Sequence, residues 1–174
     1  DGTLLKSDKT ISKNTADSLI EANQRGQSIC LCTGRGLAEL KDYEGELDFC
    51  DYGILLSGCL IYDFKHNKPL EVHSFDTDVF SQIIDVVKKE DVMLYLLEAT
   101  DSVASKKDIE NMPYYNMAIY QPMFKSHAKA VEDIYDYVDK HMDDILKICL
   151  YNPSVEATSH LLEKLKPFPV SCAW

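Results

Sequence analysis

The chain has 174 residues, of which 45% are hydrophobic and 27% are charged, and its formal net charge is −11 at pH 7. This composition is typical of a folded globular protein with one sizeable core or two small ones. Non-specific nucleic-acid binding and anionic-membrane binding both depend on basic surface, so the acidic balance argues against either partner. No apolar run approaches the roughly 20 residues that span a bilayer.

The six cysteines lie mostly in apolar, strand-like runs, which is typical of buried free thiols rather than of a disulfide framework. We expect Cys30 and Cys32 to point to opposite faces of a strand, which makes them a poor metal clip. The five histidines are scattered and none has a metal-ligand spacing to another. These patterns favour reduced thiols and a cytoplasmic protein without a zinc site.

The sequence pattern in the first third of the chain predicts two helices, and each is followed by a short apolar strand. The predicted helix, strand, helix and strand lie at 12–26, 28–32, 37–45 and 52–58. Ser12 is the expected N-cap of the first helix, and Gly26 is its expected stop. Both strands are nearly continuous apolar runs, which is typical of parallel strands covered on both faces. An exposed hairpin with its turn at Asn67 and Lys68 should follow.

After residue 65 the pattern changes to helices that alternate with strand pairs, which indicates an α+β layer. The predicted helices lie at 76–91, 126–142 and 154–165, and the predicted strands at 92–99, 101–108, 145–152 and 168–174. Residues 109–124 have no clear period and are interpreted as a loop or a short strand. The opening part shows only two strands, which cannot bury both faces of a doubly wound sheet, so we expect an incomplete chain.

Two polar turns carry the chemistry that the sequence suggests. Residues 1–3 (Asp-Gly-Thr) precede the first helix, and residues 33–35 (Thr-Gly-Arg) follow the first strand. Ligands of open α/β sheets bind at the carboxyl ends of the strands, so both turns should face one crevice. Glycine lets backbone N–H groups approach a ligand, while threonine hydroxyls and arginine suit phosphate oxygens. Asp1 beside them suits general acid–base work or supplies oxygen for Mg²⁺.

The stretches DGTLL, ISKNTADSLIEANQRGQSICLCTGR and YGILLSGCLIYD resemble the haloacid dehalogenase-like (HAD) hydrolases. The resemblance is to the Cof-like branch, in which a large type-two cap is inserted after the third core strand. It implies an α/β fold with a HAD-like Rossmannoid core, a partial parallel sheet, and an inserted α+β cap. Residues 1–65 would then be the N-terminal part of the core and residues 66–174 the cap, with the C-terminal part of the core outside the chain.

The resemblance also implies a role for each turn. The first family motif reads Asp-x-Asp-Gly-Thr, and its first Asp is a nucleophile that forms an aspartyl-phosphate. Asp1 matches the second Asp, the general acid–base, whose backbone carbonyl would also ligate Mg²⁺. Thr33 matches the Ser/Thr that holds the transferring phosphoryl group, so Asp1 and Thr33 are the expected catalytic residues. The residues expected to bind the substrate phosphate are Gly2, Thr3, Thr33, Gly34 and Arg35.

The remaining family residues would lie outside this sequence. The nucleophile is expected two positions before Asp1, and the third-motif Lys and the acidic Mg²⁺ ligands are expected beyond Trp174. Ser57 stands where most relatives carry Asn, which leaves any contact of Ser57 with the substrate open.

The expected function is a Mg²⁺-dependent phosphatase that acts on a small phosphorylated metabolite, either a sugar phosphate or a nucleotide-like phosphomonoester. Two alternatives stay open: a phosphomutase of the same fold, and a degenerate relative that binds a ligand or a partner. Cap residues would set specificity, and residues 111–117 with Lys106 or Lys107 are candidates. The simpler interpretation of these cap residues is a solvated loop and surface charge.

Overall fold

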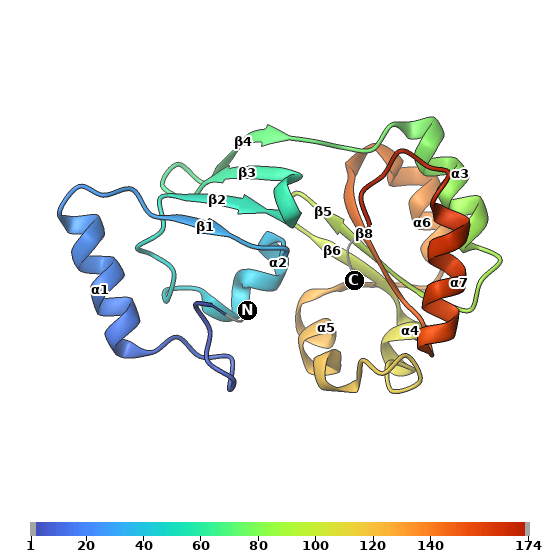
Figure 1. The fold of residues 1–174 in the computed structure, drawn as a ribbon, viewed down its shortest axis with the longest axis horizontal. Coiled ribbons are helices and arrows are strands. Elements are labelled where there is room, and N and C mark those ends of the chain that lie inside the picture. The colour runs from blue at the N-terminus through green and yellow to red at the C-terminus, as the bar shows by residue number, and fades with distance from the viewer. Residues whose placement is uncertain (1–2, 173–174) are drawn as a thin grey trace. The chain divides into compact units, whose positions relative to one another are not determined.

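The computed structural model describes residues 3–172, which form two compact units (Figure 1). One unit ends at His73 and the other begins at Ser74. The first unit extends beyond residue 65 because the last strand of its sheet ends at Val72. The interpretation of the two units as part of a core and a cap stays a prediction.

A four-stranded sheet organises the first unit, in the order β1-β2-β3-β4 (Figure 1). Its strands are β1 (Cys30–Cys32), β2 (Tyr52–Leu55), β3 (Leu60–Asp63) and β4 (Lys68–Val72). β1 and β2 are parallel, whereas β3 and β4 run antiparallel to their neighbours. The structure therefore confirms the predicted parallel pair and the predicted hairpin, whose turn includes the left-handed residue Asn67 (φ 49°).

The first helix of this unit begins and ends close to where the sequence predicts, whereas the second, expected at 37–45, is α-helical only to Leu40. In α1 (Lys13–Gln24), the Ser12 hydroxyl accepts a hydrogen bond from the Thr15 N–H at 3.1 Å. The chain leaves this helix through Gly26, which adopts a left-handed φ of 87°. The second helix, α2 (Leu37–Leu40), continues into a 3₁₀ turn at Lys41–Tyr43.

The expectation that β1 and β2 are covered on both faces is wrong for the described chain. Tyr52 and Ile54 are 40% and 38% exposed, while Leu55 and its cross-strand partner Leu60 are completely buried. Because alternate residues of a strand point to opposite faces, the core of this unit lies on one face of the sheet.

The thiols of Cys30 and Cys32 are both exposed, which corrects two expectations at once. Residues two apart on a strand share a face, so these side chains do not point to opposite faces as expected. The prediction that the thiols are buried is confirmed for Cys50 and wrong for Cys172, which is also exposed. None of the six cysteines, all of which lie within residues 3–172, forms a disulfide.

The second unit contains a sheet in the order β7-β6-β5-β8 (Figure 1). Its strands are β5 (Met93–Glu98), β6 (Ser102–Ser105), β7 (Lys129–Val131) and β8 (Ile145–Tyr151). Its helices are α3 (Thr77–Val87), α4 (Lys106–Glu110), α5 (Gln121–His127), α6 (Ile134–His141) and α7 (Val155–Leu165). Across residues 3–172, no helix combines the length and the apolar character that crossing a bilayer requires.

Helices cover both faces of this second sheet. Phe80 of α3 and Val138 of α6 pack in one cluster with Leu94 and Leu96 of β5. Neighbouring residues of β5 point the opposite way, and there Tyr95 meets Phe124 of α5 with ring centroids 4.3 Å apart. The structure therefore confirms an α+β arrangement in this part of the chain.

Parts of four predicted elements of the second unit are wrong. The strand expected at 101–108 ends at Ser105, and α4 begins at Lys106. The helix expected at 126–142 begins only at Ile134, because Asp133 caps it and β7 pairs with β6 upstream. Residues 109–124, interpreted as a loop or a short strand, form a loop of turns at 111–117 between helical segments and contain no strand. Residues 168–172 form no strand, and the N–H of Val170 instead donates to the Phe168 carbonyl at 2.8 Å.

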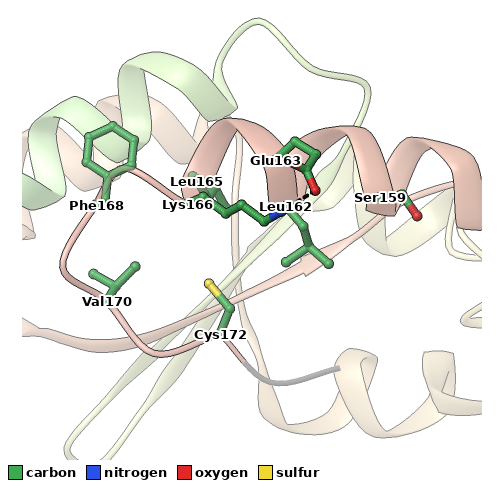
Figure 2. A pocket seen from close by; sticks show the side chains of 8 residues that line it. All are labelled: Ser159, Leu162, Glu163, Leu165, Lys166, Phe168, Val170 and Cys172. Atoms are coloured by element: carbon green, nitrogen blue, oxygen red, sulfur yellow. Dashed lines mark hydrogen bonds and ion pairs between the residues drawn. The ribbon is translucent and has the colours of Figure 1, made fainter.

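A cavity of about 460 Å³ lies between α7 and residues 168–172 (Figure 2). Leu162, Phe168 and Val170 form much of its apolar wall. Its charged residues, Lys166 and Glu163, form an ion pair with each other. The cavity therefore offers mostly hydrocarbon, and it is not a candidate for binding an anion.

Candidate functional site

Two loops lie together at the carboxyl ends of the parallel strands β1 and β2. Residues 33–35 follow β1, and residues 56–58 follow β2. Backbone hydrogen bonds join the loops, from Leu56 N to Arg35 O at 3.0 Å and from Ser57 N to Thr33 O at 3.2 Å. Ligands of α/β sheets bind at this end of parallel strands, so the joined loops form the candidate site.

Thr33 is held within its loop by its side-chain oxygen. The Arg35 N–H donates to Thr33 Oγ1 at 3.2 Å, and the Thr33 N–H donates to the Ile54 carbonyl at 3.0 Å. A hydroxyl has one proton to donate and two lone pairs that accept. The bond from Arg35 occupies a lone pair, so the Thr33 hydroxyl retains its proton as a donor for an anion.

The Arg35 side chain packs along the helix that follows its loop. Its Nη1 donates to the Glu39 carbonyl at 3.4 Å, and its guanidinium lies 5.7 Å from the centre of the Tyr43 ring. The Glu39 carboxylate in turn accepts the Gly36 N–H at 2.9 Å. The positive charge of Arg35 is therefore held against α2 and the 3₁₀ turn.

One cavity brings together three of the residues that the sequence predicts to bind phosphate. Thr3, Thr33 and Arg35 all line a cavity of about 430 Å³ within the first unit. Much of its remaining wall is apolar and includes Leu31 and Phe49. The cavity thus brings two threonines and an arginine next to apolar side chains, and apolar surroundings strengthen electrostatic contacts with an anion.

Two predicted site residues, Asp1 and Gly2, lie outside the described residues 3–172. Within that range, no group of three or more His, Cys, Asp or Glu residues could hold a metal ion. The predicted Mg²⁺ site therefore stays a prediction. The backbone carbonyl predicted to bind this ion belongs to Asp1.

Sequence reasoning missed the backbone geometry of the loop after β2. Leu56, Ser57 and Gly58 have φ values of 53°, 60° and 104°, all in the left-handed region. Gly58 is a visible signal for such a turn, but Leu56 and Ser57 are residue types that rarely adopt it. The sequence singled out Ser57 only for a side-chain contact with the substrate, which the structure does not decide.

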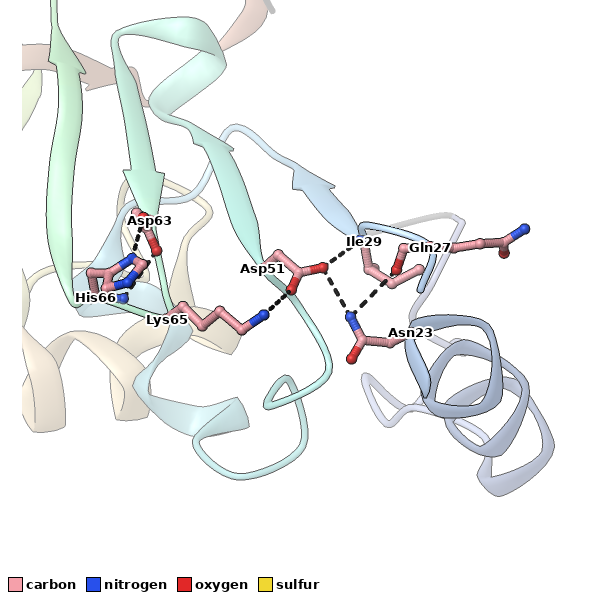
Figure 3. A network of polar contacts seen from close by, with 7 residues as sticks. All are labelled: Asn23, Gln27, Ile29, Asp51, Asp63, Lys65 and His66. Carbon is pink, nitrogen blue, oxygen red and sulfur yellow. Dashed lines mark hydrogen bonds and ion pairs between the residues drawn. The ribbon is translucent and has the colours of Figure 1, made fainter. Parts of the chain in front are cut away.

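A polar network fixes the opposite, amino ends of β1 and β2 (Figure 3). The buried Asp51 carboxylate accepts the Ile29 N–H at 2.8 Å and the Asn23 side-chain amide at 2.9 Å. These bonds, the one from Ile29 above all, hold the pKa of Asp51 below its usual value, and Lys65 adds to the effect. The network joins α1 to both strands and is structural.

A second carboxylate, Asp63, anchors the turn between β3 and β4 (Figure 3). It accepts the His66 N–H at 3.0 Å and lies 2.7 Å from Nδ1 of the same residue. The hydrogen bonds from His66 lower the pKa of Asp63. These contacts show that His66 stabilises the turn, and the sequence had assigned His66 no chemical role.

The candidate specificity residues of the second unit make ordinary surface contacts. Lys106 forms an ion pair with Glu132. In the segment 111–117, the Tyr114 hydroxyl donates to Asp91 at 2.5 Å, although Tyr114 is about half exposed. The contacts of Lys106 are those of surface charge.

Comparison with known proteins supports the same family. A family model described as haloacid dehalogenase-like hydrolase matches residues 1–172. The chain is 30% identical over 104 residues to the 5-amino-6-(5-phospho-D-ribitylamino)uracil phosphatase YitU of Bacillus subtilis (strain 168). That match covers 59% of this chain and 38% of the relative, so the chain spans well under half of its length.

Solved structures share the fold at low sequence identity. A haloacid dehalogenase-like hydrolase from B. subtilis superposes with a TM-score of 0.75 at 14% identity, over 95% of this chain and 64% of that one. The HAD subclass IIB sugar phosphatase BT4131 gives a TM-score of 0.68 at 14% identity, over 95% of this chain and 61% of that one. With the family match, which spans nearly every residue, these findings confirm the resemblance to the Cof-like branch: the chain belongs to the haloacid dehalogenase-like hydrolases.

Proposed function

We propose that this protein is a Mg²⁺-dependent phosphatase that hydrolyses a small phosphorylated metabolite through an aspartyl-phosphate intermediate. The observation that carries the proposal is the cavity along β1, which Thr3 and two residues of the loop after β1, Thr33 and Arg35, line together. The names of two similar proteins, a phosphorylated ribitylaminouracil phosphatase and a sugar phosphatase, favour sugar phosphates or nucleotide-like phosphomonoesters as substrates. The proposed setting is the cytoplasm.

In this proposal the two turns share the work of holding the phosphoryl group. The residues that bind its oxygens are Gly2, Thr3, Thr33, Gly34 and Arg35. The Thr33 hydroxyl donates a hydrogen bond to a phosphoryl oxygen whose negative charge grows during transfer. Hydrogen bonds from the neighbouring loop to Arg35 O and Thr33 O keep the backbone of its own loop in place. A donor already held in place loses little entropy when the transition state forms.

Asp1 is the proposed general acid and base. It would protonate the leaving oxygen as a carboxylate nucleophile two positions upstream attacks phosphorus, and it would then take a proton from the water that hydrolyses the aspartyl-phosphate. A bound Mg²⁺ would offset the negative charge that the nucleophile and the phosphoryl oxygens bring together. Among the residues of this sequence, the backbone carbonyl of Asp1 is its proposed ligand.

The proposed role of the second unit is that of a cap that excludes water and selects the leaving group. Cap residues that face the bound substrate would then set specificity. Changes at those residues should alter which phosphomonoester is hydrolysed, whereas changes at Thr33 should slow hydrolysis of every substrate.

The test measures free phosphate released by the purified protein from sugar phosphates and nucleoside monophosphates, with Mg²⁺ and with a chelator. Thr33→Ala should lower kcat by about 10²-fold, the loss seen when one donor to a developing oxyanion is removed. Thr15→Ala, which alters an exposed threonine of α1 in the first unit, is the matched control. Isomerised sugar phosphate without free phosphate would instead indicate a phosphomutase, and binding without turnover would indicate a degenerate relative.

A further inference from the structure

The loop 56–58 has an unusual backbone for its residue types. Leu56 and Ser57 both adopt left-handed φ values, 53° and 60°, directly before Gly58 at 104°. A side chain in this region crowds its own backbone, so residues other than glycine, Asn and Asp rarely adopt it. Such a conformation persists when surrounding contacts hold it in place.

Contacts on both sides hold this loop. The Leu56 side chain is completely buried in the core of the first unit, as is the preceding Leu55. The Leu56 carbonyl accepts the Cys59 N–H at 3.3 Å, which closes the turn. With its side chain fixed inside and its carbonyl engaged, the loop directs its N–H groups toward the neighbouring loop.

Two backbone hydrogen bonds from this loop end at the residues that flank Gly34. Leu56 N donates to Arg35 O at 3.0 Å, and Ser57 N donates to Thr33 O at 3.2 Å. The Ser57 N–H belongs to the peptide that joins Leu56 to Ser57, and this peptide rotates when φ changes at Ser57. With β3 held in the sheet after the loop, a φ at Ser57 in the ordinary right-handed or extended region would turn this N–H away from Thr33 O. The left-handed backbone is thus a condition for fixing the loop that carries the Thr33 hydroxyl.

We infer that Ser57 is a positioning residue, whose left-handed backbone rather than its side chain sets the orientation of the Thr33 hydroxyl. The inference rests on the proposed function, because it concerns how Thr33 meets the phosphoryl group. It assigns Ser57 a role through Thr33 and not through a contact with the substrate. The activity of variants should then follow how well each residue tolerates a left-handed backbone.

A substitution series at Ser57 separates the backbone from the hydroxyl. Ser57→Gly and Ser57→Asn both lack the hydroxyl but tolerate the left-handed region, so their kcat should stay near that of the wild type. Ser57→Val should lower kcat by about tenfold or more, with a smaller change in KM, because β-branched residues are genuine outliers there. Ser57→Ala should fall between them and serves if Ser57→Val does not fold.

The matched control is Asn67→Val, at another left-handed position of the same sheet (φ 49°). This substitution should lower stability while kcat per folded molecule stays unchanged, since Asn67 lies in the turn between β3 and β4. A loss at Ser57→Gly as large as at Ser57→Val would overturn the inference in favour of the hydroxyl. Wild-type kcat in Ser57→Val would overturn it as well.

Binding of inorganic phosphate, measured by calorimetry on the same proteins, separates this inference from the proposed function. If the wild type hydrolyses no phosphomonoester but binds phosphate, a roughly tenfold weaker affinity of Ser57→Val alone supports the inference while the proposed function fails. If the wild type hydrolyses phosphomonoesters and the series shows no order, the inference fails alone. If the wild type neither hydrolyses phosphomonoesters nor binds phosphate, both are overturned.

Discussion

Gly53, in the middle of β2, lies where the first sheet has too little room for a side chain. A Cβ at Gly53 would lie 2.9 Å from Cε2 and 3.0 Å from Cζ of the Phe64 ring, and 3.0 Å from Leu55 Cδ2. The ring is itself packed edge-on against Tyr62, with centroids 5.5 Å apart. Gly53→Ala therefore forces atoms of β2 or of the ring to move, and such overpacking typically costs about 1–3 kcal/mol.

Hydrogen exchange of the amides in β2 and β3 measures this cost in the affected sheet alone. Gly53→Ala should lower the free energy of opening of these amides by about 1–3 kcal/mol. Phe64→Leu removes both ring atoms that the new Cβ would meet, so Gly53→Ala should cost less in that background. A coupling below about 0.5 kcal/mol between the two substitutions, or a neutral Gly53→Ala, would refute the packing argument.

Three further predictions concern single contacts. Asp51→Asn should destabilise the first unit at neutral pH and weaken the dependence of its stability on acidic pH. The lowered pKa of Asp51 gives stability that is present above the unfolded-state pKa and is lost as the pH falls through the folded-state pKa. Urea unfolding across pH 2–7 measures this dependence. Asp133→Ala removes the acceptor of the Tyr135 and Asp136 N–H groups and should cost about 1 kcal/mol, measured by exchange of the α6 amides. Phe124→Ala empties a site that is 2% exposed and should cost about 3–5 kcal/mol, measured by thermal unfolding of the second unit.

Local signals explain which elements the sequence predicts correctly. Ser12 and Gly26 mark the ends of α1 because a cap and a left-handed stop are set by residues within the helix itself. The segment at 126–142 has no such local signal for its structure, because β7, which lies within it, forms only by pairing with β6. Its alternation fits a helix and a strand equally well, and tertiary pairing decides between them.

In the candidate site, too, features set by the local sequence could be predicted, whereas features set by tertiary contacts could not. Thr33 could be predicted because a turn after a parallel strand lies at the binding edge of the sheet whatever the rest of the fold does. The left-handed backbone of Leu56 and Ser57 could not, because bonds to residues about 20 positions earlier impose it against their own preferences. The packing of Arg35 on Tyr43 was also hidden, since the sequence presents Arg35 only as a cation next to a glycine.

The central claim is that the joined loops after β1 and β2 receive a phosphoryl group. A titration of the protein with inorganic phosphate, followed through the backbone amide resonances, tests this claim most directly. We predict that the shifts concentrate at residues 33–35 and 56–57 and that Thr33→Ala weakens the affinity. Shifts confined to the cavity beside α7, or the same affinity in Thr33→Ala as in the wild type, would contradict the account.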